Sequence, residues 1–292
     1  MRTLYVTDMD GTLLGADSRV SVRSAALISE LSRRGALITV ATARTPATVV
    51  PLLDGTCTRL PAIVMTGAAL WHLAGDRTPA RAAGTGSHYS RLTFIPGAQE
   101  ATIEATCRSC GLEPFVYTLP RGDSDILQVY HGAPALNKAE DAFYQERRAL
   151  PLKHFNLSTP VPPHCHSRKI LYFAMGDAGA IFQAGKVLEQ TTCCSVSYYP
   201  DIFNPRLGML EVFAPGVSKA AAIRQLQADC GADRLVVFGD NLNDLSMMAV
   251  ADLAVAVGNA LPEVMAAAAV VTGPNTADSV AEFIAADFAK DC

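Results

Sequence analysis

The chain has 292 residues, half of them hydrophobic and 18% charged, which is the composition of a globular protein with one large or two ordinary domains. Its net charge of −4 argues against electrostatic binding to nucleic acid or to an anionic membrane surface, although one or two basic side chains can still bind a small anion. The chain reaches Asp8 too early for the apolar region of a signal peptide, and no apolar stretch is long enough to span a bilayer. We therefore expect a cytoplasmic protein with no nucleic-acid or membrane partner, and the sequence sets no oligomeric state.

Five short apolar runs predict strands that are buried on both faces of a parallel sheet. They are Leu4–Thr7, Ala36–Ala41, Ala62–Met65, Leu235–Phe238 and Leu253–Val257. Two segments between them predict helices, each ending at a glycine that can form the C-cap: Ser21–Arg34 before Gly35, and Ser218–Cys230 before Gly231. Strands alternating with helices predict an α/β fold with a Rossmann-like, doubly wound parallel sheet.

The middle of the chain has a mixed pattern. Two strands and three helices are predicted there, at Ile126–Tyr130, Lys169–Met175, Ala98–Cys110, Ala139–Arg148 and Ala178–Gln190. Three prolines in Ser158–His166 exclude regular structure from that segment. We therefore predict a core formed by residues 1–83 and 193–292, with a smaller α/β cap domain, residues 84–192, inserted between its halves.

Polar residues follow three of the predicted core strands. They are Asp8, Asp10, Thr42, Arg44, Asp240 and Asp244. Open α/β sheets bind ligands beyond the carboxyl ends of their strands, so these side chains are expected to meet at one rim. Alone, Asp10-Gly11 is an ordinary turn signal, and an aspartate after a strand is often a helix N-cap. Carboxylates packed at one edge repel one another and raise one another's pKa, and a bound divalent cation removes this repulsion. Hard oxygen ligands favour Mg²⁺.

Lys219 begins the helix that precedes the fourth predicted strand. A lysine at a helix start is usually solvated. Next to a Mg²⁺ site and the hydroxyl of Thr42, however, it completes the equipment for phosphoryl transfer, in which catalysis consists mainly of positioning and of neutralising charge. We therefore predict that Lys219 binds phosphate.

These motifs, in this order, resemble the haloacid dehalogenase superfamily of phosphatases, in particular its Cof-type branch, subfamily IIB. Asp8–Leu14 resembles the first motif of the family, Thr42 the second, Lys219 the third and Gly239–Asp244 the fourth. The C-terminal signature of the branch is matched by Val257–Ala260, Val270–Thr272 and Asn275. In the middle the resemblance rests on placement alone, because this branch carries its α/β cap between the second and third motifs.

The resemblance implies a Mg²⁺-dependent phosphatase that acts on a small phosphorylated metabolite, with sugar phosphates as the first class to try. Asp8 is then the nucleophile that forms an aspartyl-phosphate, and Asp10 is general acid and later general base. The cap closes on the substrate and excludes water. The phosphate-binding residues implied are Thr42, Lys219, Asn243 and, toward phosphate or leaving group, Arg44. The metal ligands implied are Asp8, the backbone carbonyl of Asp10, Asp240, and Asp244 directly or through water.

Four positions depart from the usual pattern of the branch: Ala43, Thr66, Ala220 and Met265 stand where glycine, asparagine, glycine and lysine are common. None of them removes a catalytic group, so their effect is expected on loop geometry near the phosphate. Two rival functions share the site: a phosphomutase that uses the same aspartyl-phosphate, and a non-catalytic sensor of a phosphorylated ligand. A nucleotide-binding oxidoreductase is excluded, because Asp8-Met9-Asp10-Gly11 follows the first strand where a GxGxxG loop belongs.

Overall fold

The computed structural model describes residues 1–73, 88–122, 124–201 and 204–290. The chain divides into two compact units. One, here called the core unit, combines Met1–Arg91 with Ser218–Cys292, and the other, the inserted unit, is Leu92–Val217. None of the helices described has the length and apolar character that crossing a membrane requires.

The core unit contains a five-stranded parallel sheet in the order β14-β13-β12-β1-β2. Its strands are β1 (Thr3–Thr7), β2 (Leu37–Val40), β12 (Arg234–Gly239), β13 (Leu253–Ala256) and β14 (Val270–Val271). Every residue of β1 and β2 is buried, as their continuous apolar runs predict for strands covered on both faces.

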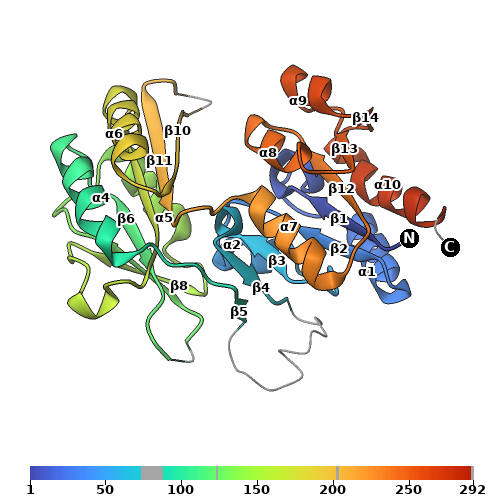
Figure 1. Ribbon diagram of the computed structural model, residues 1–292, viewed down its shortest axis with the longest axis horizontal. Helices are drawn as coiled ribbons and strands as arrows, with labels where there is room; N and C mark the ends of the chain where they lie inside the picture. The colour runs from blue at the N-terminus through green and yellow to red at the C-terminus, as the bar shows by residue number, and fades with distance from the viewer. Residues whose placement is uncertain (74–87, 123, 202–203, 291–292) are drawn as a thin grey trace. The chain divides into compact units, whose positions relative to one another are not determined.

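Helices cover both faces of this sheet, which confirms the predicted doubly wound α/β fold (Figure 1). On one face α1 (Val22–Arg34) packs against α10 (Ser279–Phe288), and on the other α7 (Lys219–Cys230) packs against α8 (Leu245–Met248). Among the described residues, this unit also contains two shorter helices, α2 (Pro46–Leu52) and α9 (Pro262–Ala267).

The two predicted core helices have the predicted caps. Ser21 accepts a hydrogen bond from the backbone of Ser24 at the start of α1, and Gly35 ends that helix in the left-handed conformation, with φ 109°. Ser218 caps α7 in the same way, and Gly231 ends it with φ 60°. The cap at Ser218 matters for function, because it fixes where α7 begins and therefore where Lys219 lies.

The predicted strand at Ala62–Met65 is present as β3 (Ala62–Val64), but its sheet is a separate one. It pairs antiparallel with β4 (Ala69–Trp71), which pairs with β5 (Tyr89–Ser90). A single parallel bridge between Ala41 and Ile63 connects it to the end of β2.

The inserted unit contains a six-stranded sheet in the order β10-β11-β9-β6-β7-β8, antiparallel except for the pair β7–β8. Its strands are β6 (Phe115–Thr118), β7 (Leu127–His131), β8 (Lys153–Leu157), β9 (Lys169–Asp177), β10 (Ser195–Pro200) and β11 (Leu207–Phe213). Its helices are α4 (Gly97–Ser109), α5 (Lys138–Arg147) and α6 (Ala178–Thr191), close to the three predicted. The proline-rich segment holds only a short 3₁₀ turn, Pro163–Cys165.

One of the two predicted domain limits can be compared with the structure. The predicted limit between residues 83 and 84 lies outside the described residues. The predicted return to the core at residue 193 differs from the division at Ser218, because β10 pairs with β11 and β11 pairs with β9. The hairpin of β10 and β11 therefore extends the sheet of the inserted unit.

Candidate active site

Asp8 comes directly after strand β1, which lies between β12 and β2, and is almost fully buried. The next residues, Met9–Leu13, form one turn of π-helix type that is interrupted by non-helical dihedrals at Asp10 and Gly11. Gly11 has φ 72°, and a Cβ at this position would lie 2.3 Å from Oδ2 of Asp240. Only glycine adopts this left-handed conformation and leaves room for Asp240, so the turn after β1 can lie directly against the residue that follows β12.

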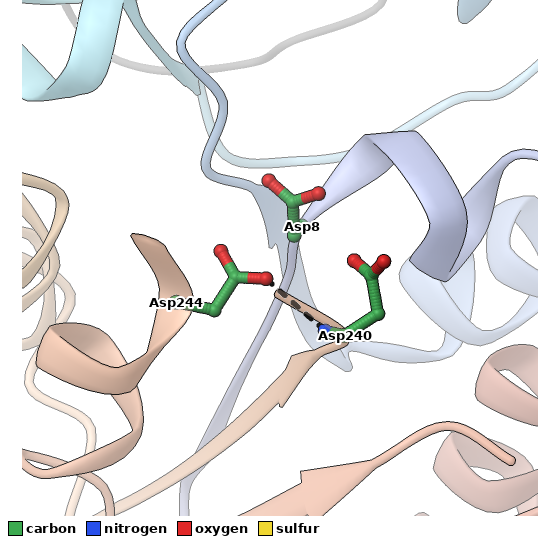
Figure 2. Close-up of side chains that lie close together, drawn as sticks. All are labelled: Asp8, Asp240 and Asp244. Atoms are coloured by element: carbon green, nitrogen blue, oxygen red, sulfur yellow. Dashed lines mark hydrogen bonds between the residues drawn. The ribbon is translucent and has the colours of Figure 1, made fainter. Parts of the chain in front are cut away.

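Three carboxylates converge at this edge of the sheet. Asp8, Asp240 and Asp244 each offer one oxygen, and the three oxygens lie within 4.8 Å of one another. Figure 2 shows the three side chains close together, with Asp244 accepting a hydrogen bond from the backbone of Asp240. That bond is 3.1 Å long, and the backbone of Asn241 donates a second one to the same oxygen at 3.2 Å.

Lys219 lies within this carboxylate cluster. Its Nζ donates to Oδ1 of Asp8 at 2.6 Å and to Oδ1 of Asp244 at 2.8 Å, and its side chain is 3% exposed. The first residue of α7 is thus tied to the loops after β1 and β12. The structure brings together four of the residues that the sequence analysis singled out: Asp8, Asp240, Asp244 and Lys219.

Burial dominates the electrostatics of the cluster. Burial raises the pKa of Asp8 to about 7, with the Asp244 charge adding to the effect and Lys219 opposing it. Burial also raises the pKa of Asp240 to about 6, against a hydrogen bond from Thr12. For Lys219, burial lowers the pKa, but the charges of Asp8 and Asp244 outweigh it and raise the pKa overall. Lys219 therefore does not offset the cost of charging Asp8 and Asp240.

The donor set fits a hard divalent cation such as Mg²⁺. Asp244 uses Oδ1 for Lys219 and Oδ2 for backbone amides. In contrast, Oδ2 of Asp8 and Oδ2 of Asp240 accept no hydrogen bond from the described residues, since Lys219 and Thr12 bind their other oxygens. Asp8 and Asp240 therefore have oxygens available for direct coordination, whereas the arrangement around Asp244 favours coordination through water.

The raised pKa values predict a pH dependence of stability. Between pH 3.8 and about 7, Asp8 and Asp240 bind more protons in the metal-free folded protein than in the unfolded chain. The stability that this binding contributes is present at low pH and is lost as the pH rises through about 6 and 7. A metal ion competes with these protons, so Mg²⁺ is expected to raise the melting temperature more at about pH 8 than at about pH 5.

Thermal unfolding with Mg²⁺ and with EDTA at both pH values measures this effect. The control is Asp240→Asn, which removes one titrating group and one ligand and is expected to reduce the Mg²⁺ effect at about pH 8. An equal rise at both pH values in the wild type would contradict a metal site at these carboxylates.

Asp10 is exposed and pairs with Arg44. Nε and Nη2 of Arg44 donate to the two carboxylate oxygens of Asp10 at 2.7 and 2.6 Å, a bidentate pair. These bonds to Asp10 raise the pKa of Arg44 against the opposing effect of burial. Arg44, predicted to face the phosphate or the leaving group, thus holds the predicted acid–base residue in this structure.

The remaining predicted phosphate ligands differ in surroundings. Thr42 is buried, and its Oγ1 accepts a hydrogen bond from the backbone of Arg44 at 3.1 Å. Its hydroxyl donates to none of the described residues. Asn243 is exposed in the turn Leu242–Asp244. One contributor is absent from the predicted set: Thr12, whose Oγ1 donates to Oδ1 of Asp240 at 2.8 Å. The sequence feature that could have identified Thr12 is its position within the first motif, Asp8–Leu14.

Of the departures from the family pattern, Thr66 has a visible structural consequence. It adopts φ 58° in the left-handed region, which is costly for a β-branched residue and easier for asparagine. Its Oγ1 is buried with no hydrogen-bond partner among the described residues. Its backbone N–H donates to the carbonyl of Thr42 at 3.0 Å, so the strained turn directly supports the loop that carries Thr42.

Comparison with known proteins links this geometry to a family. The model of the haloacid dehalogenase-like hydrolase family matches residues 5–80 and 144–284. The chain is 52% identical over 52 residues to pyridoxal phosphate phosphatase YbhA of Escherichia coli, an alignment that covers 18% of this chain and 19% of that protein. It is 26% identical over 270 residues to HMP-PP phosphatase of Cronobacter sakazakii, covering 91% of this chain and 88% of that one.

Solved structures share the fold along the whole chain. A sugar phosphatase of HAD subclass IIB aligns with a TM-score of 0.69 at 19% identity, covering 99% of both chains. At this identity the likeness establishes the fold, with its parallel core sheet and its inserted unit.

Proposed function

The chain belongs to the haloacid dehalogenase-like hydrolase family, and on that premise we propose that it is a Mg²⁺-dependent phosphatase of small phosphorylated metabolites. The observation that carries the proposal is the contact of Lys219 with Asp8 inside the carboxylate cluster. A buried nucleophile, a fixed cation and oxygen ligands for a metal lie within one site, as phosphoryl transfer needs. When bound, Mg²⁺ neutralises charge on the transferring group.

In the first step, a carboxylate oxygen of Asp8 attacks phosphorus and the bond from phosphorus to the leaving oxygen breaks. Asp10 gives its proton to that oxygen, so the product leaves as an alcohol. Lys219, and the hydroxyl of Thr42, whose proton no described residue takes, donate to the phosphoryl oxygens. We assign the exposed Asn243 the same role.

In the second step, water attacks the phosphorus of the aspartyl-phosphate, and Asp10 takes the proton of that water as the carboxylate of Asp8 leaves. The bidentate pair with Arg44 has to open before the Asp10 carboxyl can carry a proton to the leaving group. An anionic substrate offers Arg44 another partner. We therefore propose that Arg44 turns to the phosphate or the leaving group when substrate binds, and that Asp10 is its partner otherwise.

We propose sugar phosphates as the first substrate class. The support is the fold shared along the whole chain with a protein described as a sugar phosphatase. Two relatives are named for other phosphate esters, pyridoxal phosphate and HMP-PP, so these compounds belong in the same panel.

Phosphate release from p-nitrophenyl phosphate and this panel, with Mg²⁺ and with EDTA, tests the proposal. We expect release in Mg²⁺ and none in EDTA. A requirement for a bisphosphate activator would instead indicate the phosphomutase. Binding of a phosphate ester without any release would indicate the sensor.

Asp10→Asn is expected to slow both chemical steps, by roughly 10²–10⁴-fold in kcat, because an amide neither gives nor takes the proton. Steady-state phosphate release gives kcat and KM, and rapid quench separates the two steps. Arg44→Lys serves as a comparison, since it keeps the charge and loses the bidentate geometry. A change in KM alone for Asp10→Asn would contradict the acid–base role.

A further inference from the structure

Two asparagines from the C-terminal part of the core unit bind the backbone of the catalytic turn. Nδ2 of Asn259 donates to the carbonyl of Gly11 at 2.8 Å, and Nδ2 of Asn275 donates to the carbonyl of Leu14 at 2.7 Å. The two residues are also joined, because the backbone N–H of Asn275 donates to Oδ1 of Asn259 at 2.8 Å. The loops after β13 and β14 thus hold the turn after β1 at two points.

Glycine at position 258 makes this arrangement possible. The backbone of Gly258 lies against residues 272–274, where a Cβ would come within 3.0–3.1 Å of three backbone atoms, and its N–H donates to the carbonyl of Gly273 at 2.9 Å. The main chains of the loops that carry Asn259 and Asn275 are therefore in direct contact at Gly258. We call Gly258, Asn259 and Asn275 the C-terminal clamp.

The two carbonyls that the clamp binds belong to the turn that follows Asp8. Gly11 is adjacent to Asp10 and packs against Oδ2 of Asp240, the oxygen that is available for a metal. Leu14 ends the turn, and its N–H donates to the carbonyl of Met9, next to Asp8. The bond from Leu14 to Met9 closes the turn, but the turn departs from helical geometry at Asp10 and Gly11. The bonds from Asn259 and Asn275 to its carbonyls therefore hold it from outside.

We propose that the C-terminal clamp is a positioning device that sets the placement of Asp8 and Asp10 relative to Asp240. The effect of the clamp on catalysis rests on the proposed phosphatase function. The clamp does not touch the groups that hold the phosphate: Thr42 lies after β2, and Lys219 is fixed by the cap of α7 and by its own ion pairs. Loss of the clamp therefore lowers kcat and leaves KM almost unchanged.

Asn259→Asp tests the proposal with little change in shape. It keeps the acceptor for Asn275 and removes the donor to Gly11, and since Asn259 is exposed, the core packing is preserved. Asn259→Ala removes the donor without adding charge. The matched control is Gln227→Glu, the same amide-to-carboxylate change at a side chain that donates to a backbone carbonyl at the far end of α7.

We expect kcat to fall about tenfold in both Asn259 variants, the value of one hydrogen bond, with KM changed less than about twofold and the control unchanged. Hydrogen–deuterium exchange gives a readout that is independent of activity: amides of residues 9–14 should exchange faster in both variants. Unchanged exchange overturns the clamp. Faster exchange with an unchanged kcat, or with a raised KM alone, overturns its catalytic role. If the wild type releases no phosphate, the proposed function fails, and exchange still decides whether the clamp holds the turn.

Discussion

Asp8→Asn is expected to abolish turnover, with a loss of roughly 10⁴-fold or more, because the amide cannot act as the nucleophile. The same substitution should not destabilise the metal-free protein. Burial raises the pKa of Asp8 to about 7, which means that its negative charge is costly in the folded state, and a neutral amide of the same shape removes that cost. The amide oxygen can still accept the hydrogen bond from Lys219.

Phosphate release and thermal unfolding measure the two halves of this expectation. The matched control is Asp229→Asn, an aspartate whose partners on the surface are Arg91 and Gln225. It should keep wild-type turnover. An Asp8→Asn protein that is folded and still turns over at more than a trace of the wild-type rate would rule out Asp8 as the nucleophile.

Lys219→Met is expected to have the second largest effect, on stability as well as activity. Lys219 is the cation that joins the buried carboxylates of Asp8 and Asp244. Breaking a buried ion pair by removing one partner typically costs about 3–5 kcal/mol. Mg²⁺ supplies positive charge to the same carboxylates, so we expect much of the lost stability to return when it is added. Turnover should remain low, because a donor to the transferring phosphoryl group is gone.

Denaturant unfolding with Mg²⁺ and with EDTA measures the stability of this variant against Lys186→Met. Lys186 is an exposed lysine on α6, and its replacement is expected to cost little. A loss below about 1 kcal/mol for Lys219→Met in EDTA would show that the ion pair does not carry the stability of the site.

The sequence predicts the core sheet and its catalytic edge well, because both depend on local signals. Strands β1 and β12 are continuous apolar runs, and parallel neighbours in a sheet have their carboxyl ends at the same edge. Asp8 and Asp240 come directly after these two strands, so they had to lie close together. The caps of α7 at Ser218 and Gly231 are equally local, which is why Lys219 could be placed at a helix start.

Other features depend on pairings that no local signal specifies. The return from the inserted unit is predicted at residue 193, but the pairing of β11 with β9 joins segments far apart in sequence and moves it to Ser218. Arg44 was expected to face the phosphate or the leaving group, and its pair with Asp10 was not expected, because no local signal specifies the partner of a long side chain. The hydrogen bond from Asn259 to Gly11 joins residues 248 positions apart in the sequence and depends on the close backbone contact at Gly258.

The central claim is that a phosphoryl group passes through Asp8, and rapid acid quench of the wild type with a labelled phosphate ester tests it most directly. Quenched protein is digested, and the labelled peptide is identified by mass spectrometry. The account predicts an acid-stable, base-labile phosphate on the peptide that contains Asp8, formed in Mg²⁺ and absent in EDTA and in Asp8→Asn. Release of phosphate with the label on another residue, or with the Asp8 peptide unlabelled at every quench time, would contradict it.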